Sequence, residues 1–334
     1  MKTIALLCVL LLSQNVFGIS EKNYELNYAI KVLPFLLRMQ EGTFTGQENI
    51  SIHYRHYIQK EAKNCLMILP GRSEPVEKYA EVIYDLHQTP SGKNLNFFLL
   101  DHRGQGQSAR MTSPSDMGHI DEFENYILDL ETFMKLMKLG ERCEHKFLLA
   151  HSMGAGIGTS FILKYPNSFE KVAFVSPMLK IQTGDYSYAV ARAIVQAQNL
   201  IGRGDQFAIG QMGYNPDATF EKNKVTTSPA RFKMSQALND LYPKTRLGGV
   251  SNRFVLETMR GTNPLRSRYH LISAPLLVFT AGIENYSVPE EMTRLCSESA
   301  NCRPSFFAQA KHEILMERDE FRDQVIKELE NFFQ

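Results

Sequence analysis

Residues 147–158 read FLLAHSMGAGIG: an apolar run, a serine among small residues, and the start of a helix-like segment. This order predicts a strand that turns sharply into a helix and presents the Ser152 hydroxyl at the turn, an arrangement known as a nucleophile elbow. Such a turn needs small residues two positions before and two after the serine. Gly154 fits this rule, whereas Ala150 departs from the usual glycine, and a positive φ there would carry a steric penalty.

Apolar runs and helical periods alternate on both sides of this stretch. The chain begins with a helical period over 21–40 and a strand with one wet face over 49–58. Strand-like runs then span 65–69, 95–100, 146–150, 172–175, 275–280 and 305–308. Helical periods span 76–87, 121–139, 154–164, 289–297 and 319–333. The alternation predicts an α/β fold whose mostly parallel sheet is covered by helices on both faces.

His312 is the predicted general base. A serine hydroxyl becomes a good nucleophile only when a positioned imidazole takes its proton. In a fold of this kind the chain order is serine, acid, histidine, and only His312 follows both Ser152 and the last apolar run. His151 is the competitor, but neighbouring residues at a sharp turn point apart, so we expect His151 to pack beside the site.

Glu284 is the predicted acid that orients the imidazole. The apolar run from 275 ends in Gly-Ile-Glu-Asn-Tyr, and Glu284 is the carboxylate at the loop where the third member belongs. The alternative is a solvated loop glutamate, since surface Glu is common. Asn285 next to it carries no negative charge with which to stabilise an imidazolium.

Two backbone N–H groups are predicted to bind the oxyanion formed on a substrate carbonyl. One belongs to Met153, directly after the nucleophile, and the other to Arg72, in the loop after an early strand. The alternative for residues 70–71 is a simple Pro-Gly turn. Residues 101–108 carry two glycines two apart but lack the rest of a phosphate-binding pattern, so we expect a tight structural loop there.

Composition excludes several classes of protein. Of 334 residues, 43% are hydrophobic and 22% are charged, which excludes disordered, collagen-like and coiled-coil chains. The net charge of +1 gives no reason to expect nucleic acid as a partner. No Cys or His pair has zinc-ligand spacing, and no metal or cofactor is implied. Cys296 and Cys302 are close enough to bridge, whereas Cys65 and Cys143 are predicted to be buried thiols.

The first eighteen residues have the pattern of a secretory signal peptide. Lys2 precedes an apolar run from Ile4 to Leu12, and Val16 and Gly18 are the small residues expected before a cleavage site. The run is much shorter than the roughly 20 residues of a membrane span. The alternative is a buried N-terminal strand or helix. We therefore expect a secreted or periplasmic protein after cleavage near Gly18.

The stretch 182–270 breaks the alternation of strands and helices and is predicted to be an inserted helical cap. The hydrolase-like core would then comprise residues 19–181 and 271–334. From 180 to 270 there are thirteen Lys or Arg against six Asp or Glu, a local excess of +7. Such an excess indicates either a solvated helical surface or attraction to acidic head groups at a lipid surface.

Several motifs in one order resemble a known family, the lysophospholipase and monoacylglycerol lipase branch of the α/β-hydrolases, and in particular its bacterial lysophospholipase L2 members. The resemblance runs from about Tyr54 to the C-terminus. It rests on the loops 70–79 and 101–108, the elbow at Ser152, the cap segments 225–232 and 247–249, and the run 311–315. The family's acid is usually Asp, and alignment on Pro275 places that position on Glu284, which keeps the carboxylate but lengthens its arm.

The resemblance implies a serine ester hydrolase that releases a fatty acid from a single-chain lysophospholipid through an acyl-enzyme. The alternatives are a monoacylglycerol lipase or general carboxylesterase and, outside enzymes, a hydrolase homologue that only binds lipid. Peripheral contact with lipid surfaces is expected, with no protein partner implied. The sequence leaves open which head group and acyl length the substrate has, and whether the acyl group is hydrolysed or transferred to another lipid.

Overall fold

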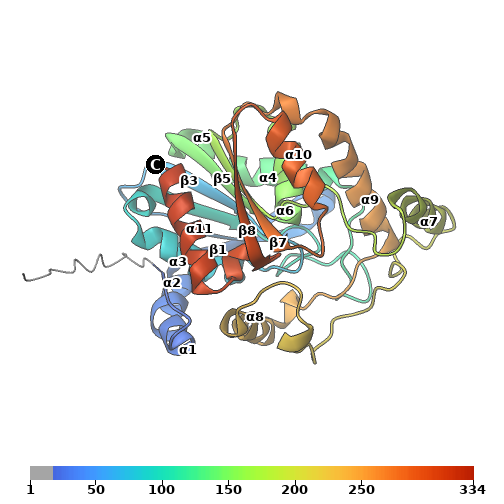
Figure 1. Ribbon diagram of the computed structural model, residues 1–334, viewed down its shortest axis with the longest axis horizontal. Helices are drawn as coiled ribbons and strands as arrows, with labels where there is room; N and C mark the ends of the chain where they lie inside the picture. The colour runs from blue at the N-terminus through green and yellow to red at the C-terminus, as the bar shows by residue number, and fades with distance from the viewer. Residues whose placement is uncertain (1–17) are drawn as a thin grey trace, which may run out of the picture.

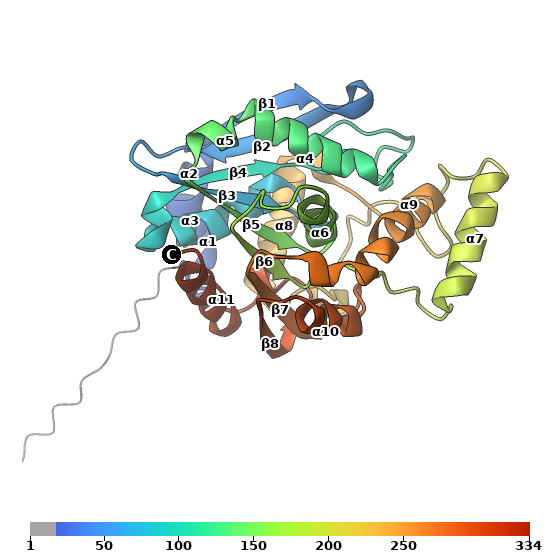
Figure 2. The same ribbon diagram turned by 90° about the horizontal axis from the view of Figure 1, so that it is seen from above.

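A computed structural model describes residues 18–334, and the predicted signal peptide therefore lies almost entirely outside the described residues. One mixed sheet forms the centre of the molecule (Figures 1 and 2). β1 pairs antiparallel with β2, and β2 antiparallel with β4; all later pairs are parallel. In sheet order the strands are β1 (Gln40–Thr45), β2 (Ser51–Tyr57), β4 (Leu95–Leu100), β3 (Asn64–Leu69), β5 (His145–His151), β6 (Lys171–Val175), β7 (Leu276–Ile283) and β8 (Cys302–Lys311).

Helices cover both faces of this sheet. The α-helices are α1 (Tyr24–Asn27), α2 (Leu33–Arg38), α3 (Ala80–Gln88), α4 (Glu124–Leu136), α5 (Leu139–Arg142), α6 (Met153–Lys164), α7 (Tyr188–Leu200), α8 (Pro229–Leu241), α9 (Asn252–Thr262), α10 (Pro289–Glu298) and α11 (Asp319–Phe332). A short π-helix, η1 (Tyr28–Val32), joins α1 to α2. Short 3₁₀ turns are η2 (Gln47–Asn49), η3 (Val76–Tyr79), η4 (Ser91–Asn94), η5 (Phe220–Lys222), η6 (Pro243–Thr245), η7 (Asn263–Ser267), η8 (Tyr269–Leu271) and η9 (Ile314–Met316).

The two faces carry two separate cores. The N-terminal helices, α3 and α11 pack on one face, whereas α4, α6 and α10 pack on the other (Figure 2). The central strands β3 and β4 are buried along nearly their whole length, which explains their continuous apolar sequence. The predicted α/β architecture is therefore confirmed. β1 was not predicted, because it is an edge strand with mostly exposed side chains and shows no apolar alternation.

The predicted cap region holds α7, α8 and α9 and, in the described chain, no named strand between β6 and β7. Each of these helices begins at a serine whose hydroxyl accepts a backbone N–H: Ser187, Ser228 and Ser251. α7 lies at the rim of the molecule and packs on α9 through a small apolar cluster (Figures 1 and 2). α9 in turn contacts α6 of the core.

Two expectations about side chains are wrong. Cys65 and Cys143 form a disulfide instead of remaining thiols, because β3 and β5 are neighbours and bring the two Cα atoms to 5.7 Å. Cys296 and Cys302, which are close in sequence, are also bridged. Arg231, counted among the basic charges of the cap surface, is 1% exposed and pairs with Glu81.

No helix within residues 18–334 combines the length and apolar composition that a membrane crossing requires.

Candidate active site

Ser152 lies at the sharp turn between β5 and α6. Its φ of 49° and ψ of −115° fall in a region that costs energy for a residue with a side chain. The surrounding backbone holds this conformation: the Ser152 N–H donates to the carbonyl of Val175, and its carbonyl accepts from Met178 N–H, each at 3.0 Å. The end of β6 and the segment after it therefore fix the serine in place.

The small residues around the serine are explained by close approaches. A Cβ on Gly154 would lie 2.3 Å from the carbonyl oxygen of Leu69, so any larger residue would push α6 away from β3. Ala150 keeps an ordinary strand backbone within β5 and is fully buried. The departure from glycine at Ala150 therefore carries no positive-φ penalty.

Ser152, His312 and Glu284 form one continuous chain of hydrogen bonds. His312 Nε2 lies 2.8 Å from Ser152 Oγ, and His312 Nδ1 lies 2.7 Å from Glu284 Oε2. An ionised carboxylate only accepts, so Nδ1 carries the proton and Nε2 is free to accept from the serine hydroxyl. The three residues follow β5, β8 and β7, whose carboxyl ends meet at one edge of the sheet. The structure thus brings together the three side chains predicted as nucleophile, base and acid.

Glu284 is held by the backbone as well as by His312. Its Oε1 accepts from the N–H groups of Tyr286 and Ser287 at 2.8 and 3.1 Å, and its side chain is only 1% exposed. Burial alone would raise the pKa of Glu284, but the hydrogen bonds from His312 and these two backbone groups outweigh burial and lower it. The carboxylate is therefore kept ionised beside the imidazole. The solvated-loop alternative does not describe this side chain.

An irregularity at the end of β7 accompanies this placement. Ala281 pairs with Phe307, but Ile283 pairs with Lys311, so β8 carries extra residues between the two pairs. A Cβ on Gly282 would lie 2.2 Å from the carbonyl oxygen of Ala308. Only glycine fits where the two strands approach this closely, directly before Glu284 leaves the sheet.

The two predicted oxyanion donors belong to the segments that follow β5 and β3, which are neighbours in the sheet. Met153 is the first residue of α6, so its N–H lies among the groups that have no partner inside the helix. Arg72 belongs to the loop after β3. Two residues of the loop 101–108 hold this loop in place. The His102 ring donates from Nε2 to the carbonyl of Pro70 at 3.1 Å, and Gln105 Oε1 accepts the Ser73 N–H at 2.9 Å. Burial lowers the pKa of His102 to about 4, so the ring is neutral near pH 7.

Residues 101–108 form the tight structural loop that the sequence favoured. Asp101 accepts from the N–H groups of Val76 and Gln107, both at 2.9 Å, and contacts His53 Nδ1 at 2.8 Å. Gly106 has a φ of +49°, and a Cβ there would lie 2.1 Å from the Asp101 carboxyl carbon. The glycine therefore serves the turn around this buried carboxylate.

A buried polar network behind His312 was missed by the sequence analysis, apart from the expectation that His151 packs beside the site. Glu74 Oε2 accepts from His151 Nδ1 and Gly71 N–H, each at 2.7 Å, and Lys78 joins Glu74 to Glu313. Burial would raise the pKa of Glu74, but His151 and Lys78 outweigh it and hold the pKa well below the usual value. Glu74 and His151 lie 77 residues apart, and Lys78 and Glu313 lie farther apart still; only the four-residue Glu74–Lys78 spacing could have given a signal.

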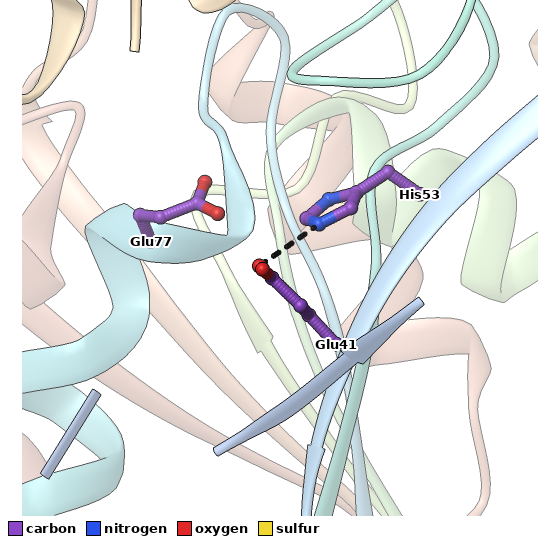
Figure 3. A group of neighbouring side chains, drawn as sticks. All are labelled: Glu41, His53 and Glu77. Atoms are coloured by element: carbon purple, nitrogen blue, oxygen red, sulfur yellow. Dashed lines mark ion pairs between the residues drawn. The ribbon is translucent and has the colours of Figure 1, made fainter. Parts of the chain in front are cut away.

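Glu41, His53 and Glu77 are the group within residues 18–334 that most resembles a metal site (Figure 3). Their possible ligand atoms all lie within 4.8 Å of one another. The guanidinium of Arg55 pairs with both carboxylates, at 2.9 Å to Glu77 and in close contact with Glu41. A cation of the chain therefore already bridges the two carboxylates, and we assign the cluster a structural role.

A cavity of about 630 Å³ opens onto Ser152 and His312. The core contributes Arg72, His151 and Tyr286 to its wall. The predicted cap region contributes mostly apolar side chains: Ala191, Ile194, Val195, Ala208, Ile209, Val225, Val250, Phe254 and Val255. The serine therefore lines a cavity whose wall on the side of the cap region is mostly apolar.

Known structures share this fold. A soluble variant of monoglyceride lipase from Saccharomyces cerevisiae superposes with a TM-score of 0.67 at 16% identity, covering 89% of this chain and 94% of that chain. A carboxyl esterase from Bacillus coagulans gives a TM-score of 0.69 at 12% identity, covering 89% and 99%. With the elbow and the sheet order, these similarities define an α/β-hydrolase.

The family is narrower than the fold. The family described as serine aminopeptidase, S33, matches residues 60–319, and the chain belongs to it. The chain is 30% identical over 308 residues to a probable lysophospholipase L2 of Haemophilus influenzae, covering 90% of this chain and 94% of the relative. It is 27% identical over 306 residues to lysophospholipase L2 of Escherichia coli, covering 90% and 88%. The predicted resemblance is confirmed, and acyl-enzyme chemistry at a serine is general for this family.

Proposed function

We propose that this protein is a lysophospholipase that removes the fatty acid from a single-chain phospholipid. Ser152 attacks the ester carbonyl while His312 takes its proton, and Glu284 stabilises the imidazolium. The N–H groups of Met153 and Arg72 bind the oxyanion. His312 then protonates the leaving glycerol oxygen and later activates the water that releases the fatty acid. The apolar walls of the cavity accommodate the acyl chain.

The side chain of Arg72 is the observation that supports a substrate with a phosphate-bearing head group. It lines the cavity, and its Nη1 donates to the carbonyl of Gly248 at 2.7 Å. Burial lowers the pKa of Arg72, yet arginine stays protonated. Among residues 18–334, no carboxylate forms an ion pair with this guanidinium. A half-buried cation that forms no ion pair among the described residues and lines the cavity with the nucleophile favours an anionic substrate, and guanidinium binds phosphate oxygens well.

The test replaces Arg72 with Met, which keeps the backbone N–H and most of the stem but removes the charge. We expect kcat/KM for lysophosphatidylethanolamine to fall about 10- to 100-fold, the range of a lost charged hydrogen bond. Turnover of a monoacylglycerol of equal acyl length should stay within about threefold. Arg260→Gln, at an exposed arginine of α9, is the matched control. An equal loss on both substrates would contradict the head-group assignment.

The same assay separates the alternatives. A monoacylglycerol lipase or general carboxylesterase would prefer the neutral ester in the parent protein and ignore the Arg72 substitution. A lipid-binding homologue without activity would turn over neither substrate and would fail to react with a fluorophosphonate. We expect labelling of Ser152 at a rate that His312→Ala reduces strongly.

We also propose peripheral contact between the cap and lipid surfaces. Large apolar side chains are exposed there, at 81% for Leu200, 63% for Ile201 and 71% for Met212. Lys222 and Lys224 are exposed and precede Val225 of the cavity wall. Arg231 is buried and Lys233 pairs with Glu25, so neither contributes a free surface charge.

Substituting Lys222 and Lys224 by Gln should reduce activity on anionic vesicles and weaken its salt dependence, because exposed charges act within a screening length of about 8–10 Å. Turnover of a short soluble ester should not change. Replacing Lys233 and Glu25 together by Gln is the control, because it removes an exposed pair whose charges already cancel. No loss on vesicles would assign these lysines to an ordinary solvated surface.

We propose that the protein acts outside the cytoplasm, after removal of residues 1–18. The Cys65–Cys143 and Cys296–Cys302 disulfides support this proposal, because disulfides persist mainly in oxidising compartments. Fusing residues 1–30 to a reporter that is active only after export tests the leader. Retention of the reporter in the cytoplasm would contradict the proposal.

A further inference from the structure

Ile19, directly after the proposed cleavage position, is anchored deep in the protein. It is 2% exposed, and its backbone nitrogen donates to Asp85 Oδ1 at 3.1 Å. Its carbonyl accepts from Nη2 of Arg231 at 3.2 Å. The following Ser20 and Glu21 are tied to Asp319 through a hydroxyl and a backbone N–H. The chain at this point is held by side chains from α3, α8 and α11.

Asp85 lies in a buried ionic cluster between α3 and α11, which run side by side in Figures 1 and 2. Asp85 is 0% exposed and pairs with Arg322, while Arg231 pairs with Glu81 at 2.9 Å. These four buried charges balance. The remaining ionisable groups that face the cluster are acidic or phenolic: Asp319, Asp323, Glu21 and Tyr24. The cluster therefore carries excess negative charge, and one more cation would reduce that excess.

Gly18 lies beside the Ile19 nitrogen, which would become a cation if the chain began at Ile19. A Cβ on Gly18 would lie 3.0 Å from Asp85 Oδ2 and 3.3 Å from Nη1 of Arg322. Residue 18 is thus pressed against these two charged groups while it remains attached to Ile19. Removing it would free the space around the Ile19 nitrogen on the side of the Asp85 carboxylate.

We infer that cleavage between Gly18 and Ile19 creates an α-ammonium group that forms a buried ion pair with Asp85 and locks the processed chain into its fold. The inference depends on the proposed removal of residues 1–18, but on no part of the proposed enzymatic activity. Hydrolysis adds one water across the Gly18–Ile19 amide. The new carboxylate leaves with the leader, and the amine remains on Ile19 and takes up a proton.

The sign of the pH dependence follows from the two partners. In the uncut chain, burial raises the pKa of Asp85 to about 7 although Arg322 opposes the shift, so ionising Asp85 costs stability as the pH rises from about 4 to 7. A neighbouring ammonium removes much of that cost. The pairing also raises the pKa of the α-amine above its ordinary value of about 7.7–8.0. With Asp85 ionised, the stabilisation is therefore complete below about pH 7.7 and is lost as the pH rises through the folded-state pKa of the amine. It is also lost in acid, where Asp85 takes up a proton.

The experiment compares three chains that differ only at the N-terminus: Ile19–Gln334 with a free amine, the same chain acetylated, and a chain that starts at Gly18 with its own amine acetylated. At pH 7 we expect the free amine to melt about 4–8 °C above the other two, as a buried ion pair in a chain of this size allows. The difference should shrink above pH 10. In the folded free-amine chain, acylation of the α-amine should be at least about tenfold slower than in the unfolded chain.

Two matched variants separate the pair from general packing. In Asp85→Asn the free and acetylated chains should have equal melting temperatures, whereas in Asp319→Asn their difference should persist, because Asp319 accepts from Ser20 and Glu21 instead of Ile19. Should Asp85→Asn fail to fold, the comparison in the parent and the amine labelling still decide. Equal melting of the free and blocked parent chains, or a secreted protein whose first residue is not Ile19, would overturn the inference.

Discussion

Removing the negative charge of Glu284 tests the proposed site most directly. In Glu284→Gln the side-chain oxygen can still accept from the N–H groups of Tyr286 and Ser287, so the loop should keep its shape. The amide nitrogen would then face Nδ1 of His312, where the carboxylate oxygen lies at 2.7 Å in the parent. Two donors cannot share that contact. The imidazole must therefore move its proton to Nε2, the atom that has to accept the proton of Ser152.

The size of the loss follows from this change of tautomer. Neutralising the acid of a related triad costs on the order of 10⁴ in rate, whereas the acid of subtilisin matters less than its other two members. Glu284 is almost fully buried and loses both its charge and the correct tautomer, so we expect kcat to fall about 10³- to 10⁴-fold. That is about 4–5.5 kcal/mol of transition-state stabilisation at 1.36 kcal/mol per tenfold.

Glu284→Asp separates charge from reach. It keeps the negative charge but shortens the arm by one methylene, so the carboxylate cannot reach His312 while also accepting from Tyr286 and Ser287. A misplacement of about 1 Å costs about 10²-fold, which places Asp between the parent and Gln.

The assay for both variants is kcat on a short soluble ester, with melting temperature as a check on folding. Glu290→Gln, at an exposed carboxylate in the first turn of α10, is the control and should leave kcat unchanged. Activity of Glu284→Gln within tenfold of the parent would refute the role of this carboxylate.

Three further outcomes follow from the structure. Ser152→Ala should lower kcat by about 10⁶-fold with melting within about 2 °C of the parent, since it deletes one oxygen at the elbow; activity within tenfold would remove Ser152 from its role. Replacing Cys65 and Cys143 together by Ala should cost about 4.5 kcal/mol of unfolding free energy, from the entropy of the 78-residue loop, and urea unfolding under non-reducing conditions measures it. As the pH falls from 6.5 to 4, the unfolding free energy of His102→Gln should decrease less than that of the parent, because the lowered pKa of His102, about 4, means that protons bind to the unfolded chain first. Parallel plots of unfolding free energy against pH for the two proteins would contradict this.

The sequence predicted those features that depend on local order along the chain. Ser152, Glu284 and His312 were found because each directly follows an apolar run, and the carboxyl ends of parallel strands meet at one edge of the sheet. Distant pairings gave no such signal. Cys65 meets Cys143 only because β5 pairs with β3, a neighbour relation that no local pattern shows. Arg231 looked like a surface charge because its buried partner Glu81 lies 150 residues away.

The disulfides lie at the end of the sheet opposite the reaction. Cys65 and Cys302 are at the amino ends of β3 and β8, whereas Ser152, Glu284 and His312 follow the carboxyl ends of parallel strands. The last residue of the chain lies at that same end, since Lys171 at the start of β6 bonds to the carbonyl of Gln334. A tag, dye or solid support attached to the C-terminus would therefore leave the entrance to the cavity unobstructed and turned away from the attachment surface.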